Sequence, residues 1–273
     1  MARSIIGGFL LLALSAPAQE RAPDPVEIVR RSVERDWTDF ESRKNYTYQQ
    51  RSELRQYGRN GALGRVRSET HETLILGGRP YERLIARDDK PLPAREERRQ
   101  HAKLDNELSK RQNESPREQA RYQEERVEER AYIREIPDAF TFRLVGKGVV
   151  SNRPAWMIEA RPKPGYRAVH SRAKDFARVR ATIWIEEETY HWVKVDADVL
   201  NTISVGFGLL RIAPGSSMHF EQTLVNDEIW LPSSMLVRFE ARLALVKGLR
   251  GEYDIRYSGY RKFQSDSKIV EGQ

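Results

Sequence analysis

The chain has 273 residues, of which 32% are charged, 39% are hydrophobic and none is cysteine. So many charged residues exclude a protein that crosses a membrane several times, and the lack of cysteine excludes disulfides, thiolate nucleophiles and cysteine-bound metal clusters. The net charge of +7 is a small difference between 47 basic and 40 acidic residues, so it does not indicate a nucleic-acid partner, and we expect none.

The first eighteen residues have the pattern of a secretory signal peptide. Arg3 supplies a positive charge, residues 5–14 form an apolar run, and small residues lead up to Ala18. The run is too short to span a bilayer as a helix. We therefore expect residues 1–18 to be a signal peptide cleaved after Ala18, and residues 19–273 to form a single domain exported to the periplasm.

The next segment predicts one helix followed by strands. Asp24 and Pro25 suit the N-cap and the first helical position, and apolar residues from Val26 to Phe40 recur at helical spacing. Extended, β-branched and aromatic runs follow, separated by glycine-containing turns. These runs cover residues 46–50, 66–76 and 81–86.

Residues 94–135 have a different character, with 11 basic and 11 acidic residues. Ser115, Pro116 and Glu118 form the signature of a capping box. We expect a charged helical hairpin, residues 94–112 and 116–134, inserted in the domain and stabilised by pairs such as Glu107 with Arg111. Because it has few apolar residues, we expect it to cover another element or project into solvent rather than form a core.

From Phe140 onward the sequence predicts strands. Apolar and polar residues alternate in runs that begin near residues 140, 156, 179, 218, 235 and 253, with short turns between them. Such runs predict an antiparallel meander with one apolar face. The expected fold class is α+β: a large curved antiparallel sheet, or incomplete β-barrel, covered by the N-terminal helix and the charged helical hairpin.

The apolar face of this sheet has two interpretations. It packs against the covering helices as an ordinary core, or it is concave enough to enclose an apolar ligand. Under the second interpretation, the candidate ligand-binding residues are Trp156, Ile158, Ile183, Ile185, Phe220, Val237 and Phe239.

Residues 161–180 hold seven basic residues and one acid, and their prolines and glycine predict a loop or short helix. The segment is either a solvated loop or a docking patch for an anionic membrane surface or an acidic protein partner. Its candidate docking residues are Arg161, Lys163, Arg167, Arg172, Lys174, Arg178 and Arg180.

The sequence contains no motif of a conventional enzyme, and we expect no catalytic residue, no metal and no cofactor. The five histidines lack metal-ligand spacing, and no phosphate loop or nucleophile elbow is present. Glu186 to Glu188 include the paired carboxylates that a glycosidase needs, but a solvated hairpin tip explains them. His219 and Glu221 share a strand face and could touch, although we expect both at the surface.

Four motifs occur in order along the chain: an aromatic-Gln strand at residues 48–50, a Trp-Ile-acid hairpin at 181–190, a Trp-Leu-Pro strand start at 226–232 and a terminal Tyr-x-x-Tyr-Arg-x-Phe strand at 257–263. Together they resemble the outer-membrane lipoprotein-sorting proteins, a family of Lol-type periplasmic carriers. The resemblance implies a half-barrel whose concave face accepts acyl chains.

The family resemblance therefore favours a non-enzymatic periplasmic carrier that binds acyl chains or lipoproteins. Two alternatives remain open on the same evidence. One is a periplasmic protein-interaction or sensor module on the same fold, with its cavity filled by its own side chains. The other is an exported hydrolase.

Overall fold

The computed structural model describes residues 23–58, 60–205, 209–243 and 247–263. The predicted signal peptide lies outside these residues. None of the described helices is both long and apolar enough to cross a membrane. The helices are α1 (Pro25–Arg43), α2 (Ala94–Gln112), α3 (Pro116–Ala131) and α4 (Ile136–Ala139), with 3₁₀ helices η1 (Tyr132–Glu135) and η2 (Ser171–Arg178).

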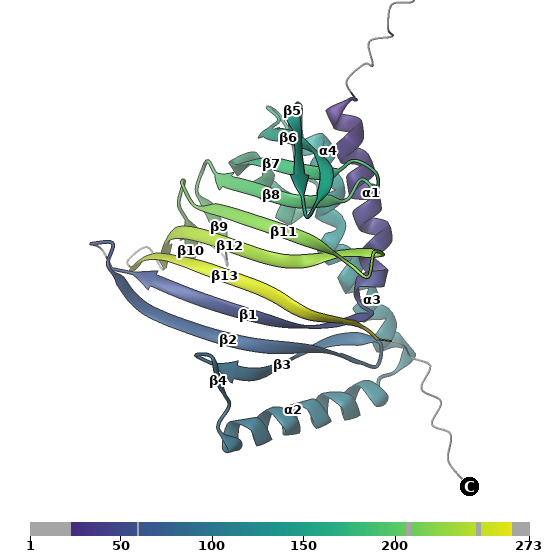
Figure 1. Cartoon of the computed structure of the whole chain (residues 1–273), viewed down its shortest axis with the longest axis vertical. Coiled ribbons are helices and arrows are strands. Elements are labelled where there is room, and N and C mark those ends of the chain that lie inside the picture. Colours follow the sequence, from purple (N-terminus) through teal and green to yellow (C-terminus); the bar gives the residue numbers. More distant parts are fainter. Residues whose placement is uncertain (1–22, 59, 206–208, 244–246, 264–273) are drawn as a thin grey trace, which may run out of the picture.

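All described strands belong to one antiparallel sheet. They are β1 (Tyr46–Tyr57), β2 (Leu63–Leu76), β3 (Arg79–Arg87), β4 (Lys90–Pro91), β5 (Phe140–Val150), β6 (Arg153–Pro162), β7 (Val179–Glu186), β8 (Trp192–Val199), β9 (Ile203–Val205), β10 (Leu210–Ile212), β11 (Ser217–Val225), β12 (Ile229–Leu243) and β13 (Lys247–Lys262). Along the main path their order is β4-β3-β2-β1-β13-β12-β11-β8-β7-β6-β5, which leaves the sheet open. The predicted α+β class with an open curved sheet is confirmed (Figure 1).

Short hairpins explain why strands that follow one another in the sequence also pair. The turns at Asp88–Asp89, Ser151–Asn152 and Asn226–Asp227 have positive φ at both central residues. This geometry matches the right-handed twist of the flanking strands, and Asn and Asp tolerate it well. Pairing of β1 with β13 then joins the strands β1–β4 to the strands β5–β13 in one open sheet.

Helix α1 runs across several strands of the sheet, close to the ends of those strands (Figure 1). It begins as predicted, because the Asp24 carboxylate accepts a hydrogen bond from the Val26 amide at 3.0 Å. Ile28 and Val29 of this helix are buried against the sheet. The apolar stripe expected from Val26 to Phe40 is rotated from the observed one, because the inward face is centred on residues 28, 29, 32, 36 and 39.

Helix α2 confirms its predicted boundaries, and α3 confirms its predicted start and its capping box. The predicted end of the second helix at residue 134 is wrong, because α3 ends at Ala131 and the 3₁₀ helix η1 follows it. The Ser115 hydroxyl accepts from the Glu118 amide, and Glu118 accepts from the Ser115 amide at 2.8 Å. Neither helix has a buried residue. The two helices diverge from their connecting turn: α2 lies along β3, whereas α3 runs behind the sheet toward α1 (Figure 1).

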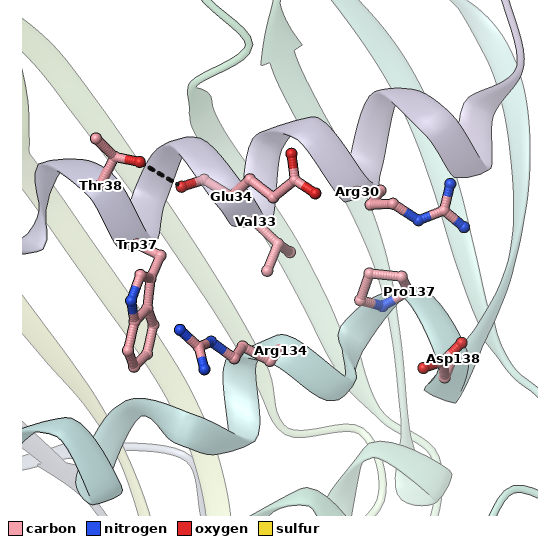
Figure 2. A pocket seen from close by; sticks show the side chains of 8 residues that line it. All are labelled: Arg30, Val33, Glu34, Trp37, Thr38, Arg134, Pro137 and Asp138. Carbon is pink, nitrogen blue, oxygen red and sulfur yellow. Dashed lines mark hydrogen bonds between the residues drawn. The ribbon is translucent and has the colours of Figure 1, made fainter.

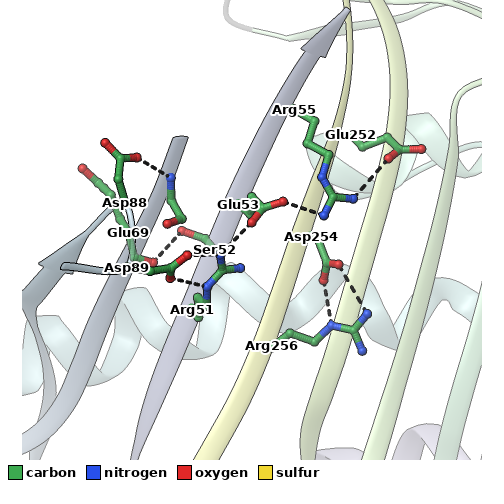
Figure 3. A network of polar contacts seen from close by, with 11 residues as sticks. Arg51, Ser52, Glu53, Arg55, Glu69, Asp88, Asp89, Glu252, Asp254 and Arg256 are labelled. Carbon is green, nitrogen blue, oxygen red and sulfur yellow. Dashed lines mark hydrogen bonds and ion pairs between the residues drawn. The ribbon is translucent and has the colours of Figure 1, made fainter. Parts of the chain in front are cut away.

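The face of the sheet turned away from the helices carries rows of paired charges (Figure 3). Arg51 contacts Glu53 at 2.6 Å, and Glu53 contacts Arg55 at 2.6 Å on the same strand. On the neighbouring strand, Arg256 donates to Asp254. Each exposed pair contributes little to stability. Because these rows make this face of the sheet polar, the apolar residues of the strands lie on the opposite, concave face.

Candidate functional site

An apolar cavity of about 290 Å³ lies between the helices and the concave face of the sheet. Its lining comes from α1 (Val29, Ser32, Val33, Asp36), from η1, α4 and η2 (Tyr132, Ile133, Ile136, Phe176), and from the strands (Phe140, Ala160, Val179, Ala181, Ile183, Ile185, Trp192, Val195, Ala197, Met218). The lining is almost entirely apolar, and α1 contributes its two most polar members, Ser32 and Asp36. The cavity is therefore suited to an apolar group with one polar end.

The structure brings together four of the seven predicted ligand-binding residues. Ile183 and Ile185 line the cavity. Ile158 lies beside Ile183, and Trp156 beside Ile185, in the register of β6 with β7. Both β6 residues are buried in the core under α1 rather than in the cavity wall, with Ile158 completely inaccessible.

The other three candidates lie farther along the same concave face. Phe220 packs against Trp192 with ring centroids 5.2 Å apart, and Trp192 itself lines the cavity. Val237 pairs with Met218 across β11 and β12, and Phe239 pairs with Gly251 across β12 and β13. All three candidates are half-buried, so the apolar face continues beyond the enclosed part of the cavity.

Asp36 is a buried carboxylate at the cavity wall, with a side chain only 2% exposed. It accepts hydrogen bonds from Trp192 Nε1 at 3.0 Å and from Arg130, and it pairs with Arg43 Nη2 at 2.8 Å. Burial alone would raise the pKa of Asp36, but the two guanidinium groups more than offset it and lower the pKa. Asp36 is therefore ionised at neutral pH.

Arginine side chains of α3 and η1 stack on aromatic rings of α1. Arg126 and Arg130 lie 4.5 and 4.6 Å from the centroid of the Phe40 ring, and Arg134 lies 3.7 Å from that of Trp37. Cation–π contacts of this kind explain how a helix without buried residues packs against α1. The predicted charged segment thus covers α1 through arginines rather than through an apolar stripe.

An open groove of about 500 Å³ runs beside this seam, between α1 and the η1–α4 segment (Figure 2). The stacked side chains of Trp37 and Arg134 line it together with Arg30, Glu34 and Asp138 (Figure 2). The groove mixes charges of both signs with apolar surface. It lacks the enclosed apolar lining that distinguishes the cavity on the other side of α1.

A second buried polar group connects α1 to the turn between β7 and β8. His191 Nε2 lies 2.5 Å from Asp39 Oδ2, and His191 Nδ1 lies 2.7 Å from the Thr189 hydroxyl. Glu186 accepts from the Thr189 amide at 2.6 Å and from Arg153 at 3.1 Å. The expected solvated tip is therefore wrong for Glu186, which is 1% exposed because these donors compensate its burial.

This threonine, histidine and aspartate have the residue types of a nucleophilic triad. His191 is buried and lies outside the lining of the cavity. Burial lowers the pKa of His191, and Asp39 offsets this only in part. The contacts of His191 with Asp39 and Thr189 connect the β7–β8 turn to α1.

Between β6 and β7 the basic segment forms a loop and the 3₁₀ helix η2, as predicted. The prediction is wrong at its two ends, because Arg161 lies on β6 and Arg180 on β7. Four of its seven basic residues have acidic partners: Arg161 with Glu159, Arg172 with Glu129, Arg178 with Asp175, and Arg180 with Asp198. The remaining three, Lys163, Arg167 and Lys174, are exposed. The accessible positive charge is therefore smaller than the sequence count suggests.

The histidines show one predicted contact and no cluster of metal ligands. His219 Nε2 lies 3.3 Å from Glu221, as two residues on one strand face allow, and Nδ1 also contacts Asp196. Within the described ranges, no group of three or more histidine, aspartate or glutamate side chains is placed to hold a metal ion.

Sequence reasoning missed Asp36 and Arg130 as site residues. Asp36 follows Val29 and Val33 at helical spacing, so an acid inside the apolar pattern of α1 was the available signal. A buried acid needs a cationic partner. No local pattern shows that this partner comes from Arg130, which is 94 residues away in the sequence.

No protein-family model matches the sequence, and no curated protein sequence matches it either. Among solved structures, a DUF1329 family protein from Desulfovibrio piger is similar at 13% identity and TM-score 0.33, covering 90% of this chain and 95% of that one. A putative outer membrane lipoprotein-sorting protein domain from Vibrio parahaemolyticus is similar at 10% identity and TM-score 0.34, covering 88% and 95%.

A LolA superfamily protein from Nitrosomonas europaea is similar at 10% identity and TM-score 0.31, covering 89% of this chain and 94% of that one. The group that the sequence motifs resemble is thus found again among the structural neighbours.

Proposed function

We propose that the chain is a non-enzymatic periplasmic binding protein that holds an acyl chain, from a lipid or a lipoprotein, in the cavity under α1. The observation that supports this function is the apolar cavity itself, closed on one side by α1, η1 and η2 and on the other by the concave sheet face. Its volume of about 290 Å³ is close to the smallest common ligand pockets, at roughly 300 Å³.

The affinity would come from apolar burial. Each methylene removed from water contributes about 0.8 kcal/mol, which corresponds to about a fourfold gain in affinity per methylene. The half-buried face of Phe220, Met235 and Val237 continues from the cavity wall, so a chain longer than the enclosed volume would still meet apolar surface. This arrangement fits an extended aliphatic chain better than a compact polar metabolite.

The proposal includes export of the chain to the periplasm. The signal-like residues 1–18 support export, and the absence of cysteine in the whole sequence is compatible with an oxidising envelope. A carrier role adds a donor and an acceptor to the binding function. In that role the ligand would be a lipoprotein acyl group rather than a free lipid.

Filling the cavity tests the proposal. Ala181 lines the cavity, whereas the neighbouring Thr182 lies on the opposite face of the same strand. We expect purified protein to bind a fluorescent fatty-acid analogue saturably. Ala181→Phe should weaken this binding at least tenfold, and the control Thr182→Phe should leave it unchanged.

Two results would contradict the proposal. One is a folded wild-type protein with no saturable binding, which would favour the protein-interaction module. The other is equal binding by both variants, which would place the analogue outside the cavity. Far-UV circular dichroism and urea midpoints show whether each variant is folded.

A further inference from the structure

Two polar side chains of α1, Ser32 and Asp36, belong to the otherwise apolar wall of the cavity. They are four residues apart, so they lie one helical turn apart on the same face of α1. Both are buried, with Ser32 3% exposed and Asp36 2% exposed. We call these two residues the polar pair.

The Ser32 hydroxyl has no hydrogen-bond partner among the described residues, although Ser32 is buried. Thr38 on the same helix shows the usual arrangement, because its hydroxyl donates to the Glu34 carbonyl oxygen at 3.0 Å (Figure 2). Ser32 Oγ is also not one of the unpartnered side-chain atoms that the described chain encloses completely. The hydroxyl is therefore open to the cavity, where a bound group can pair with it.

Asp36 keeps room for one more hydrogen-bond donor. Its Oδ1 contacts Trp192 Nε1 at 3.0 Å and Arg43 at 2.8 Å, whereas Oδ2 accepts only from Arg130 among the described residues. A carboxylate has about four acceptor sites. The polar pair thus offers one hydroxyl and one further acceptor position on the cavity side of α1.

The surroundings of the polar pair favour an uncharged ligand group. Arg43 and Arg130 lie outside the cavity lining and direct their donors at Asp36, and Asp36 is the only charged residue in that lining. An ion that entered would lose its water without gaining a partner of opposite charge, which is expensive in an apolar setting. An uncharged hydroxyl or amide avoids this cost, because it can both donate and accept a hydrogen bond.

We propose that the polar pair binds an uncharged hydroxyl or amide group at the inner end of an amphiphile whose chain follows the apolar wall. This inference rests on the acyl-binding function proposed above and narrows its ligand class to fatty alcohols and amides. Ser32 donates to the oxygen of the bound group, and the O–H or N–H of that group donates to Asp36. A fatty acid, by contrast, enters with its methyl end and keeps its carboxylate outside.

Ligands with one chain length and different polar groups test the inference. We would titrate octan-1-ol, octanamide, octan-2-one and octanoate into the purified protein at pH 7 by calorimetry, where octanoate is ionised. The alcohol and the amide should bind about fivefold more tightly than the ketone, which accepts a hydrogen bond but cannot donate one, and than octanoate. The tighter of the alcohol and the amide identifies the preferred group.

Ser32→Ala is the informative variant, because it removes the hydroxyl and leaves every contact of Asp36 in place. It should weaken binding of octan-1-ol and octanamide about fivefold, the effect of one hydrogen bond, and leave octanoate binding unchanged. The control is Thr38→Val, which removes a hydroxyl of the same helix that lines the open groove instead of the cavity. This control should bind all four ligands as wild type does.

The outcomes separate this inference from the function on which it rests. Equal affinity of wild type for the four ligands would overturn the polar pair as a binding site while leaving acyl binding intact. The same conclusion follows if Ser32→Ala weakens no ligand, or weakens octanoate as much as octan-1-ol. Failure of folded wild type to bind any of the four would overturn the acyl-binding function, and the polar site with it.

Discussion

Removing the charge of Asp36 should destabilise the fold strongly. The Asp36→Asn variant keeps the size of the side chain but leaves two guanidinium groups, of Arg43 and Arg130, near a buried neutral amide. Breaking a buried ion pair by removing one partner costs about 3–5 kcal/mol. Both arginines are partly exposed and can turn toward water, so we expect a loss near the lower end, about 3 kcal/mol.

Urea unfolding measures this loss. With a slope of about 2–3 kcal/mol per molar urea, the midpoint of Asp36→Asn should fall by about 1 M. The control is Asp198→Asn, which breaks the half-exposed pair with Arg180 and should cost less than about 1 kcal/mol. A loss below about 1 kcal/mol for Asp36→Asn would refute the view that this carboxylate anchors α1 and α3.

The difference in stability between wild type and Asp36→Asn should also depend on pH. The pKa of Asp36 is lowered in the folded state, so its contribution is fully present above the unfolded value, about 3.9, and is lost as the pH falls through the folded pKa. The stability difference between wild type and Asp36→Asn should therefore be constant from pH 5 to 7 and shrink below about pH 4. A difference that grows on acidification would contradict this assignment.

Two further predictions concern the sheet and the basic segment. Gly251→Ala should lower the free energy of unfolding by about 1–3 kcal/mol, because a Cβ there would lie 2.6 Å from the Arg55 carbonyl oxygen. The control Gly248→Ala, where a Cβ meets open space, should be close to neutral in the same urea assay. Changing Lys163, Arg167 and Lys174 together to Ser should abolish any co-sedimentation with anionic vesicles at low salt, since each contributes about 1 kcal/mol near an anionic surface; equal sedimentation of variant and wild type would refute docking by this segment.

Local sequence patterns predicted the helix starts and most strands of the fold, but no predicted run covers β4, β8, β9 or β10. The capping residues Asp24 and Ser115 mark true helix starts, and alternation along residues 179–185 marks a true strand with one apolar face. These signals act over a few residues, so they survive in any tertiary context. The open antiparallel sheet followed from the short turns between such strands.

The polar parts of the site could not be predicted in the same way. Burial of Glu186 depends on Arg153, and burial of Asp36 depends on Arg130, partners that lie far away in the sequence. The face of α1 was misplaced for a related reason. By their spacing, Trp37 and Phe40 look like residues that pack on the sheet. In the structure, their rings pack against arginines of α3 and η1.

A chain-length series tests the central claim, that the cavity holds an acyl chain, most directly. Fatty acids of eight to fourteen carbons would be titrated into wild type and Ala181→Phe at constant pH and salt. We predict that affinity for wild type rises about fourfold per methylene, as apolar burial requires, and that Ala181→Phe flattens this rise. Affinity that does not depend on chain length in wild type, or the same slope in both proteins, would contradict the claim.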